Sequence, residues 1–297
     1  MNRKMNYEKH AEHALGFEID FIFPEGLPPG KVDMIQTENS RKTDKVIEHK
    51  IKHHWEKNKQ PRMFNGDRAR YEGKRYDEKS CKLNIFYSHE RYMTYFYTAD
   101  KGLPRSYQAD LLSINGVVIT KDNLIPVGLR GVETNQAKIW HIVPAGYIDV
   151  NLVDAKAKVG MPTLSEAWHS ETPYVATERE LHEELSLPME SVDTNRMRVV
   201  GIIFNYHTNF DTTISVIVPV DCDSSEIALK GSEHETLRFL KVSLSVLKEQ
   251  LIELSLDLSR NSGHLRGDIA LTIAYLYGYS EYCKTLKSVQ KEISELS

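Results

Sequence analysis

The sequence has few cysteines and no long apolar run. Its 297 residues include three cysteines, Cys81, Cys222 and Cys283, which lie far apart and lack the spacing of metal ligands. No run approaches the length of about 18 apolar residues that a membrane helix needs. The first ten residues, MNRKMNYEKH, lack the apolar core of a secretion signal. We therefore expect reduced thiols, no membrane partner and a cytoplasmic protein.

An excess of positive charge is also missing. The chain has 38 lysines and arginines against 42 aspartates and glutamates, a formal net charge of -4. Proteins that bind nucleic acids usually carry a basic domain or stripe. The most basic stretch, residues 50–59, is interrupted by acidic residues, so we interpret it as a solvated helix face. No nucleic-acid partner is expected.

The remaining pattern mixes strands with helices, which predicts an α/β sandwich with a mixed sheet. Residues 59–80 look like a polar connector. The aromatic stretch Tyr92–Tyr97 is compatible with either a core strand or a dimer surface. Strands are expected within residues 17–23, 82–87, 110–120, 124–131, 138–149, 197–206, 212–220 and 236–242. Helices are expected within residues 40–58, 173–185, 244–256, 265–278 and 280–296.

One helix carries a cluster of carboxylates. In residues 171–187, ETPYVATERELHEELSL, Thr172 can cap the helix and Pro173 suits its first position. Glu180, Glu183 and Glu184 fall at i, i+3 and i+4, so they share one face and repel each other by roughly 0.2–0.5 kcal/mol per pair. A divalent cation would relieve that repulsion, and oxygen ligands suit Mg²⁺ or Mn²⁺. A charged face in solvent is the alternative.

The wider spacing resembles the Nudix box, which reads Gly, five residues, Glu, seven residues, Arg-Glu-aliphatic-any-Glu-Glu-any-Gly-aliphatic. Two positions depart from it: Ser165 replaces the opening glycine and Ser186 the late one. The late glycine normally eases the helix exit, so a serine predicts a different end geometry. The matching positions are Glu171, Arg179, Glu180, Leu181, Glu183, Glu184 and Leu187.

The resemblance implies a Nudix-type α/β/α sandwich that uses Mg²⁺ or Mn²⁺ to hydrolyse a diphosphate linkage in a nucleoside diphosphate derivative. It assigns Glu180, Glu183 and Glu184 to metal binding, and one of them to catalysis as general base. Glu171 and Arg179 would form a structural ion pair. Pro144-Ala145-Gly146 resembles the family's Pro-Gly-Gly, so the carbonyl of Ala145 or Gly146 would add a metal ligand. Glu233 and Glu235, in a later loop, are further candidates for ligand or base.

Candidates for substrate binding are less specific. Arg130, at the end of a strand, would hold a phosphate or pair with a surface carboxylate. Six aromatic residues are candidates for stacking on a base, although such residues lie in the core or on the rim more often than they contact a ligand. They are Trp140, Tyr147, Trp168, Phe204, Tyr206 and Phe210.

The N-terminal part has a looser resemblance. Gly26-Leu27-Pro28, a helix with Trp55, and the segment 62–66 (RMFNG) look like the front of the Nudix branch that hydrolyses UDP-sugars. This predicts an extension, residues 1–105, packed on a Nudix domain with C-terminal helices, residues 106–297. The products would be a nucleoside monophosphate and a sugar phosphate. A homodimer is left open.

Two other functions compete with a hydrolase. A catalytically silent Nudix-fold module that binds nucleotides or regulates would explain the two missing glycines, but a pure binder has no need of the glutamate cluster. A structural or interaction protein with a solvated glutamate helix would leave the seven matched positions unexplained. The hydrolase is therefore the leading interpretation.

Overall fold

The fold is taken from a computed structural model that describes residues 15–59, 63–132, 134, 137–150, 170–205, 211–231, 233–259 and 261–296. Its centre is a five-stranded sheet in the order β1-β10-β11-β5-β8. The contact between β11 and β5 is parallel and the others are antiparallel, so the expected α/β class with a mixed sheet is confirmed. The strands are β1 (Glu18–Leu27), β5 (Leu112–Ile119), β8 (Ala145–Tyr147), β10 (Arg198–Asn205) and β11 (Asp211–Pro219).

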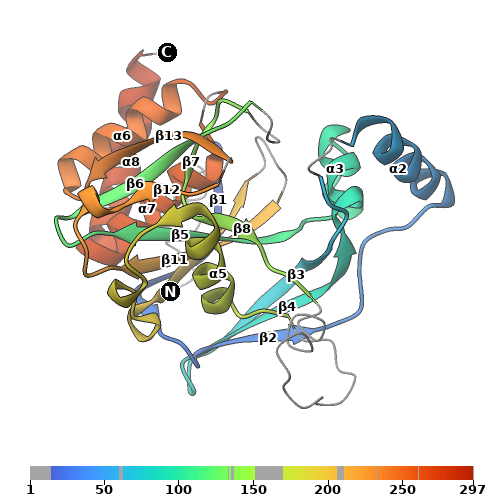
Figure 1. The fold of residues 1–297 in the computed structure, drawn as a ribbon, viewed down its shortest axis with the longest axis horizontal. Coiled ribbons are helices and arrows are strands. Elements are labelled where there is room, and N and C mark those ends of the chain that lie inside the picture. Colours follow the sequence, from blue (N-terminus) through green and yellow to red (C-terminus); the bar gives the residue numbers. More distant parts are fainter. Residues whose placement is uncertain are drawn as a thin grey trace.

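Helices cover both faces of this sheet (Figure 1). Alternate residues along a strand point to opposite faces: Ile214 and Val216 of β11 join the hydrophobic cluster under α5 (Pro173–Glu184), whereas Ile217 joins the cluster under α7 (Gly263–Tyr277). The helices α6 (Leu244–Leu256) and α8 (Tyr279–Leu296) pack against α7. The layers are therefore helix, sheet and helix.

Two smaller sheets complete this sandwich. One has the order β13-β6-β7 and the other pairs β12 with β9. Their strands are β6 (Leu124–Arg130), β7 (Trp140–Ile142), β9 (Leu185–Ser186), β12 (Ala228–Leu229) and β13 (His234–Lys241). Within the described ranges, no helix is both long enough and apolar enough to cross a membrane.

A second body is formed by a three-stranded sheet, β2-β4-β3, with the helix pair α2 and α3 at its end. It joins the sandwich where the amide of Ala69 donates to the carbonyl of Ile148 at 3.0 Å and that of Tyr71 to Asp110 at 2.9 Å. Its elements are β2 (Val32–Gln36), α2 (Lys45–Asn58), β3 (Asp67–Asp77), β4 (Lys82–Arg91) and α3 (Tyr92–Asp100).

Two expectations for this body are wrong. The supposed connector contains β3, which pairs with β4 along its length and buries Ala69 and Tyr71. The aromatic stretch Tyr92–Tyr97 begins helix α3 instead of forming a strand, although aromatic residues favour strands. Burial of Tyr95 and Tyr97 decides its conformation, because tertiary packing outweighs intrinsic preferences of this size.

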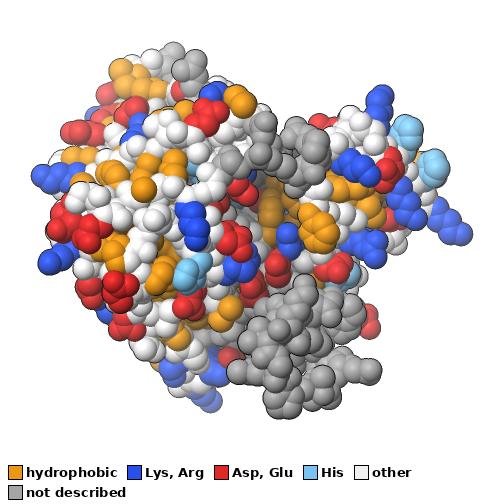
Figure 2. Space-filling view, viewed as in Figure 1, with side chains coloured by type: hydrophobic (Ala, Val, Ile, Leu, Met, Phe, Trp, Pro, Cys, Tyr) orange, Lys and Arg blue, Asp and Glu red, His pale blue; other side chains and the backbone are white. Residues whose placement is uncertain are grey.

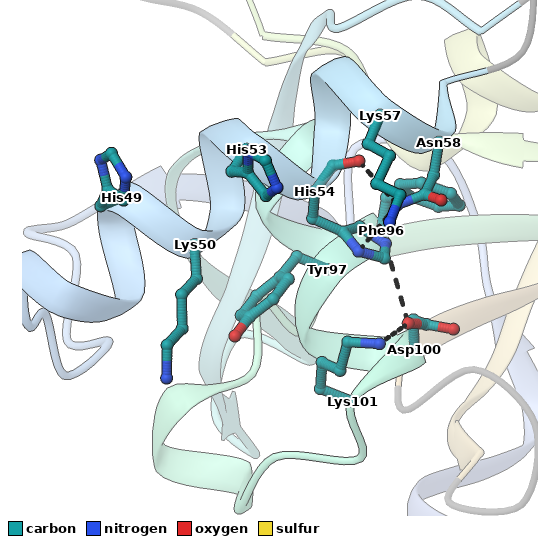
Figure 3. Close-up of a pocket in the computed structure, with 10 residues that line it drawn as sticks. All are labelled: His49, Lys50, His53, His54, Lys57, Asn58, Phe96, Tyr97, Asp100 and Lys101. Atoms are coloured by element: carbon teal, nitrogen blue, oxygen red, sulfur yellow. Dashed lines mark hydrogen bonds and ion pairs between the residues drawn. The ribbon is translucent and has the colours of Figure 1, made fainter.

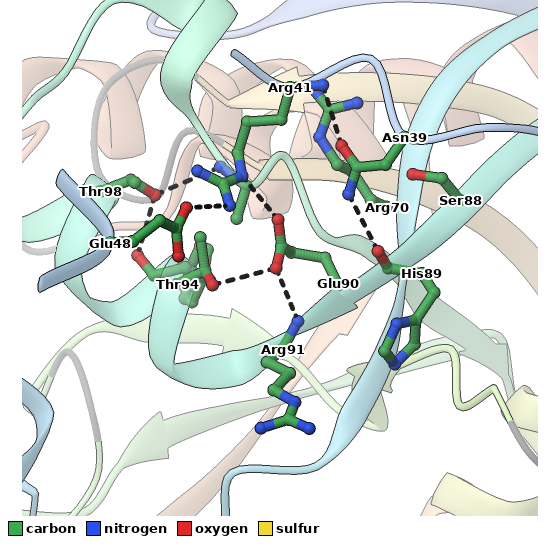
Figure 4. A network of polar contacts seen from close by, with 12 residues as sticks. Asn39, Arg41, Glu48, Arg70, Ser88, His89, Glu90, Arg91, Thr94 and Thr98 are labelled. Atoms are coloured by element: carbon green, nitrogen blue, oxygen red, sulfur yellow. Dashed lines mark hydrogen bonds and ion pairs between the residues drawn. The ribbon is translucent and has the colours of Figure 1, made fainter. Parts of the chain in front are cut away.

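A buried arginine ties the segment before α2 to β4 (Figure 4). Arg41 donates through Nε to Glu90 at 2.6 Å and through Nη2 to Glu48 of α2 at 2.8 Å. The other oxygen of Glu90 accepts from the hydroxyl of Thr94 and the amide of Arg91, both at 3.0 Å. The side chain of Glu90 is 9% exposed and that of Glu48 is 38% exposed.

We predict that Glu90→Ala and Glu48→Ala differ sharply in stability. Loss of Glu90 leaves the Arg41 charge buried without its inner partner, which costs about 3 kcal/mol or more. Loss of the more exposed Glu48 costs less than about 1 kcal/mol. Urea denaturation of both variants measures the two free energies of unfolding, and equal losses would contradict this account.

Candidate functional site

The start of α5 follows the local signals in its sequence. The Thr172 side chain accepts a hydrogen bond from the amide of Val175 at 3.3 Å, and Pro173 occupies the first turn. Leu181 is fully buried in the hydrophobic cluster under α5, while Glu183 and His182 are exposed. This orientation brings the glutamate face against the strand β8.

The end of α5 explains the serine at the late box position. Leu185, the C-cap, has φ -118° and ψ 140°, so the chain leaves the helix extended instead of turning through a left-handed residue. Ser186 then pairs with Ala228 in the β9–β12 ladder, and the carbonyl of Glu184 accepts from the amide of Lys230 at 2.7 Å. The different end geometry expected from Ser186 is confirmed, because an extended exit needs no glycine.

Arg179 joins three parts of the chain. Its Nε and Nη2 donate to the two carboxylate oxygens of Glu171 at 3.0 and 2.9 Å, and Nη2 also donates to the carbonyl of Tyr147 at 3.0 Å. Its Nη1 donates to Glu180 at 2.5 Å. The expected pair with Glu171 is present, and it fastens the segment before α5 and the strand β8 to the helix.

Glu180 and Glu184 are buried against β8. The amide of Ala145 donates to Glu184 at 2.9 Å. At Gly146 a side chain has no room, because a Cβ atom there would lie 1.8 Å from Oε1 of Glu180. Burial, with the charges of Glu183 and Glu233, raises the pKa of Glu180 to about 7. Burial and the charges of Glu180 and Glu233 raise the pKa of Glu184 well above its usual value. Burial and the surrounding negative charges disfavour the ionised forms of the two carboxylates, and a bound cation would favour those forms.

The two loop glutamates differ in their surroundings. Glu233 influences both Glu180 and Glu184, and its carboxylate lies 3.7 Å from Nη2 of Arg130. Glu235 instead accepts from Lys138 and from the amide of Val132, which holds it to the loop after β6. Glu233 is therefore electrostatically coupled to Glu180 and Glu184, whereas Glu235 is held by Lys138 and the amide of Val132.

The donors fit a hard cation by their chemistry. Glu180, Glu183, Glu184 and the backbone of Ala145 and Gly146 offer only oxygen ligands, which Mg²⁺ and Mn²⁺ favour. Among the described residues, however, no three His, Cys, Asp or Glu side chains already form a group that would hold a metal ion. In this arrangement Arg179 donates to Glu180 and the Ala145 amide donates to Glu184, so both buried carboxylates already have protein partners.

The aromatic candidates are engaged with protein groups. The Arg238 guanidinium lies 4.2 Å from the ring centre of Trp140, and that of Arg105 lies 3.8 Å from Phe204. Tyr147 packs edge-on against Tyr92 and Tyr95 at 5.8 and 5.6 Å. Trp168, Tyr206 and Phe210 lie outside the described residues. Arg105 carries no sequence signal that distinguishes it from a surface arginine.

A buried pair beside Tyr147 also has no signal in the sequence. His264 of α7 lies 3.2 Å from the carboxylate of Asp211, and both are almost fully buried. Burial lowers the pKa of His264, but the Asp211 charge outweighs it and the net pKa is raised. Asp211 in turn adds to burial in raising the pKa of Tyr147. Packing of α7 against β11 brings these two residues, which are distant in sequence, together.

No protein-family model and no curated protein matches this chain. Solved structures that resemble it include a C. elegans Ap4A hydrolase (13% identity, 57% of this chain and 98% of that one, TM-score 0.33) and a Nudix hydrolase from M. smegmatis (16%, 55% and 86%, 0.30). A third is a bifunctional NMN adenylyltransferase/ADP ribose pyrophosphatase from Francisella tularensis, complexed with AMP and a Mn ion (16%, TM-score 0.33). The match covers 55% of this chain but only 40% of that protein.

We predict that Glu180 makes stability depend on pH. A carboxyl group with a higher pKa in the folded than in the unfolded chain contributes stability that is complete below the unfolded value, 4.5, and is lost as the pH rises to about 7. Glu180→Gln replaces the carboxyl group with an amide that does not titrate in this range. The stability of the wild type relative to the variant should fall between these values, by at most about 1.4 kcal/mol per pH unit.

Urea unfolding in EDTA at the two ends of this pH range measures the effect. The matched control is Glu190→Gln, an exposed carboxylate outside the site, whose difference from wild type should stay the same at both ends. A wild-type advantage over Glu180→Gln that grows with pH would overturn the assignment.

Proposed function

We propose that this chain is a Nudix-class hydrolase that cleaves a diphosphate linkage in a nucleoside diphosphate derivative with the help of Mg²⁺ or Mn²⁺. The observation that carries the proposal is the set of contacts around Arg179. One guanidinium binds Glu171 and Glu180 while Gly146 leaves just enough space for the Glu180 carboxylate. A solvated surface helix would need neither contact.

Glu180, Glu183 and Glu184 would hold the metal, together with the carbonyl of Ala145 or Gly146. The cation supplies charge neutralisation for the diphosphate oxygens and the leaving group. The raised pKa values of Glu180 and Glu184 support this role, because the burial of like charges is tolerable when a cation shares the site. Arg179 and Glu171 act as positioning residues that orient the helix.

In this proposal, residues on the rim of the glutamate site transfer the proton and bind the phosphate. Glu233 is our candidate for the general base, since its carboxylate is 59% exposed and is electrostatically coupled to the two buried glutamates. Arg130 is beside it and would contact a substrate phosphate. Glu235 is the weaker candidate because Lys138 holds it.

The substrate we favour is a UDP-sugar, which would give a nucleoside monophosphate and a sugar phosphate. This rests on the N-terminal segments around Gly26, Trp55 and Phe64. Trp140, Tyr147 and Phe204 contribute to the walls of the site in this proposal, but a base would have to displace Arg238 or Arg105 to stack on Trp140 or Phe204.

A silent binding module is the second candidate. The observation in its favour is that Arg179 already pairs with Glu180 and lies 3.8 Å from Glu183, so part of the negative charge is offset without an ion. Turnover separates the two candidates.

We predict that Glu183→Gln lowers turnover at least 100-fold without loss of stability, because Glu183 is exposed and its proposed partner is the metal. The assay detects the phosphomonoester products through a coupled phosphatase that releases their phosphate, with Mg²⁺, across UDP-glucose, ADP-ribose, NADH, dinucleoside polyphosphates and nucleoside triphosphates. The matched control is Glu178→Gln on the same helix, outside the glutamate set, which should stay within about twofold.

Turnover of one compound, lost in Glu183→Gln and kept in Glu178→Gln, would establish the hydrolase and its substrate class. Unchanged turnover in Glu183→Gln would exclude the proposed metal site. A folded protein with no turnover on any compound, but with a divalent cation bound in calorimetry, would favour the binding module.

A further inference from the structure

A pocket of about 800 Å³ lies between α2 and α3, in the second body (Figure 3). Its size lies within the range of about 300–1,000 Å³ typical of small-molecule sites. None of its lining residues belongs to the glutamate site described above. Six of them are lysines or histidines: Lys50, Lys57, Lys101, His49, His53 and His54.

Helical spacing gathers these groups. Lys50, His53, His54 and Lys57 fall at i, i+3, i+4 and i+7 of α2 and share one side, while Trp55 is buried. The sequence alone presented this stretch as a solvated face. In the structure α3 lies beside it and adds Lys101, so that part of the face becomes a wall of the pocket.

The charge of the pocket is opposite to that of the chain. The protein carries a formal charge of -4, but three lysines line the pocket against one carboxylate, Asp100. Asp100 is already paired with Lys101 at 2.5 Å. Figure 2 shows lysine, arginine and histidine side chains gathered over this lobe, in contrast to the acidic groups scattered over the sandwich. The pocket therefore attracts anions.

His54 offers a hydrogen-bond donor inside the pocket. Its Nδ1 lies 3.0 Å from the side-chain amide nitrogen of Asn58, which makes Nδ1 the acceptor and leaves the proton on Nε2. Nε2 is buried without a hydrogen-bond partner in the described part of the chain, 3.7 Å from the Asp100 carboxylate. Burial, with the charges of Lys101, His53 and Lys57, lowers the pKa of His54. Lys57 and Lys101 line the same pocket as His54.

An aromatic surface completes the pocket. Phe96 is half-buried and its ring centre lies 5.1 Å from that of His54, while the ring of Tyr97 lies 5.4 Å from the same imidazole. An inorganic phosphate would fill only a small part of this space and would leave the rings unused. A phosphate joined to a planar base uses both the cations and the rings.

We propose that the α2–α3 pocket is a second ligand site that binds a nucleotide, with its phosphate at Lys57 and His54, its base against Phe96, and Lys50 adding positive charge farther along α2. The site needs no divalent cation, because its own side chains supply the positive charge. It therefore stands independently of the proposed hydrolase activity.

The test is calorimetric titration in EDTA, which removes the cation that the proposed catalytic site requires. The probes are AMP, adenosine and inorganic pyrophosphate. We expect AMP to bind the wild-type protein with a submillimolar Kd and adenosine not to bind measurably. Lys50→Gln combined with Lys57→Gln should weaken AMP binding at least tenfold, because both lysines are exposed and their loss leaves the fold intact.

Lys52→Gln is the matched control: an exposed lysine of the same helix that does not line the pocket. Its AMP affinity should stay within twofold of wild type. The absence of AMP binding to wild type, or an equal loss in Lys52→Gln, would overturn the site. Pyrophosphate binding as tight as that of AMP would overturn the role of the rings and hence the nucleotide. Because these titrations contain no divalent cation, their outcome is separate from that of the turnover assay.

Discussion

The arrangement of the glutamate helix depends on one buried ion pair, Arg179 with Glu171. The side chain of Glu171 is 3% exposed, so its charge is tolerable only with a partner that satisfies both oxygens. The planar guanidinium does so and still reaches Glu180 and the carbonyl of Tyr147. A lysine in its place would carry the same charge but lack the planar group that donates two hydrogen bonds to one carboxylate. Through this group the helix, the segment before it and the strand β8 have a single relative position.

That position buries two carboxylates whose negative charges repel each other. Burial raises the pKa of Glu180 and of Glu184, and the charge of Glu233 raises both further. One guanidinium and one backbone amide offset part of their charge. The opposite face of the sheet contains a second buried polar group, in which the Asn115 amide donates to Asp268 at 2.5 Å and burial raises the pKa of Asp268 to about 7. The sheet therefore separates two clusters of polar residues, and only the one on the α5 side reaches the surface through Glu183 and Glu233.

The second body is in contact with this region through aromatic side chains. Trp55 of α2 packs on Tyr92 of α3 at 6.3 Å, and Tyr92 packs on Tyr147 of β8 at 5.8 Å. The α2–α3 pocket and the strand beside the glutamates are thus joined by packed rings, and the buried Arg41–Glu90 pair anchors the approach to α2. Both bodies combine a rigid framework with a locally concentrated charge, negative in one and positive in the other.

The sequence by itself determined the helices other than α3, most strands of the sandwich and the register of the glutamates on α5, because these follow from local periodicity, capping residues and helical spacing. It also indicated the altered helix end, since Ser186 is not suited to a left-handed exit. Tertiary structure alone decided that Tyr92–Tyr97 is helical, that β3 is a strand, and that Glu233 is electrostatically coupled to the buried glutamates whereas Glu235 is held by Lys138. It also decided the Asp211–His264 pair and the pocket between α2 and α3. These features depend on contacts between segments far apart in the chain. The free energy of burial at those contacts outweighs the local conformational preference, and it cannot be read from the sequence of either segment alone.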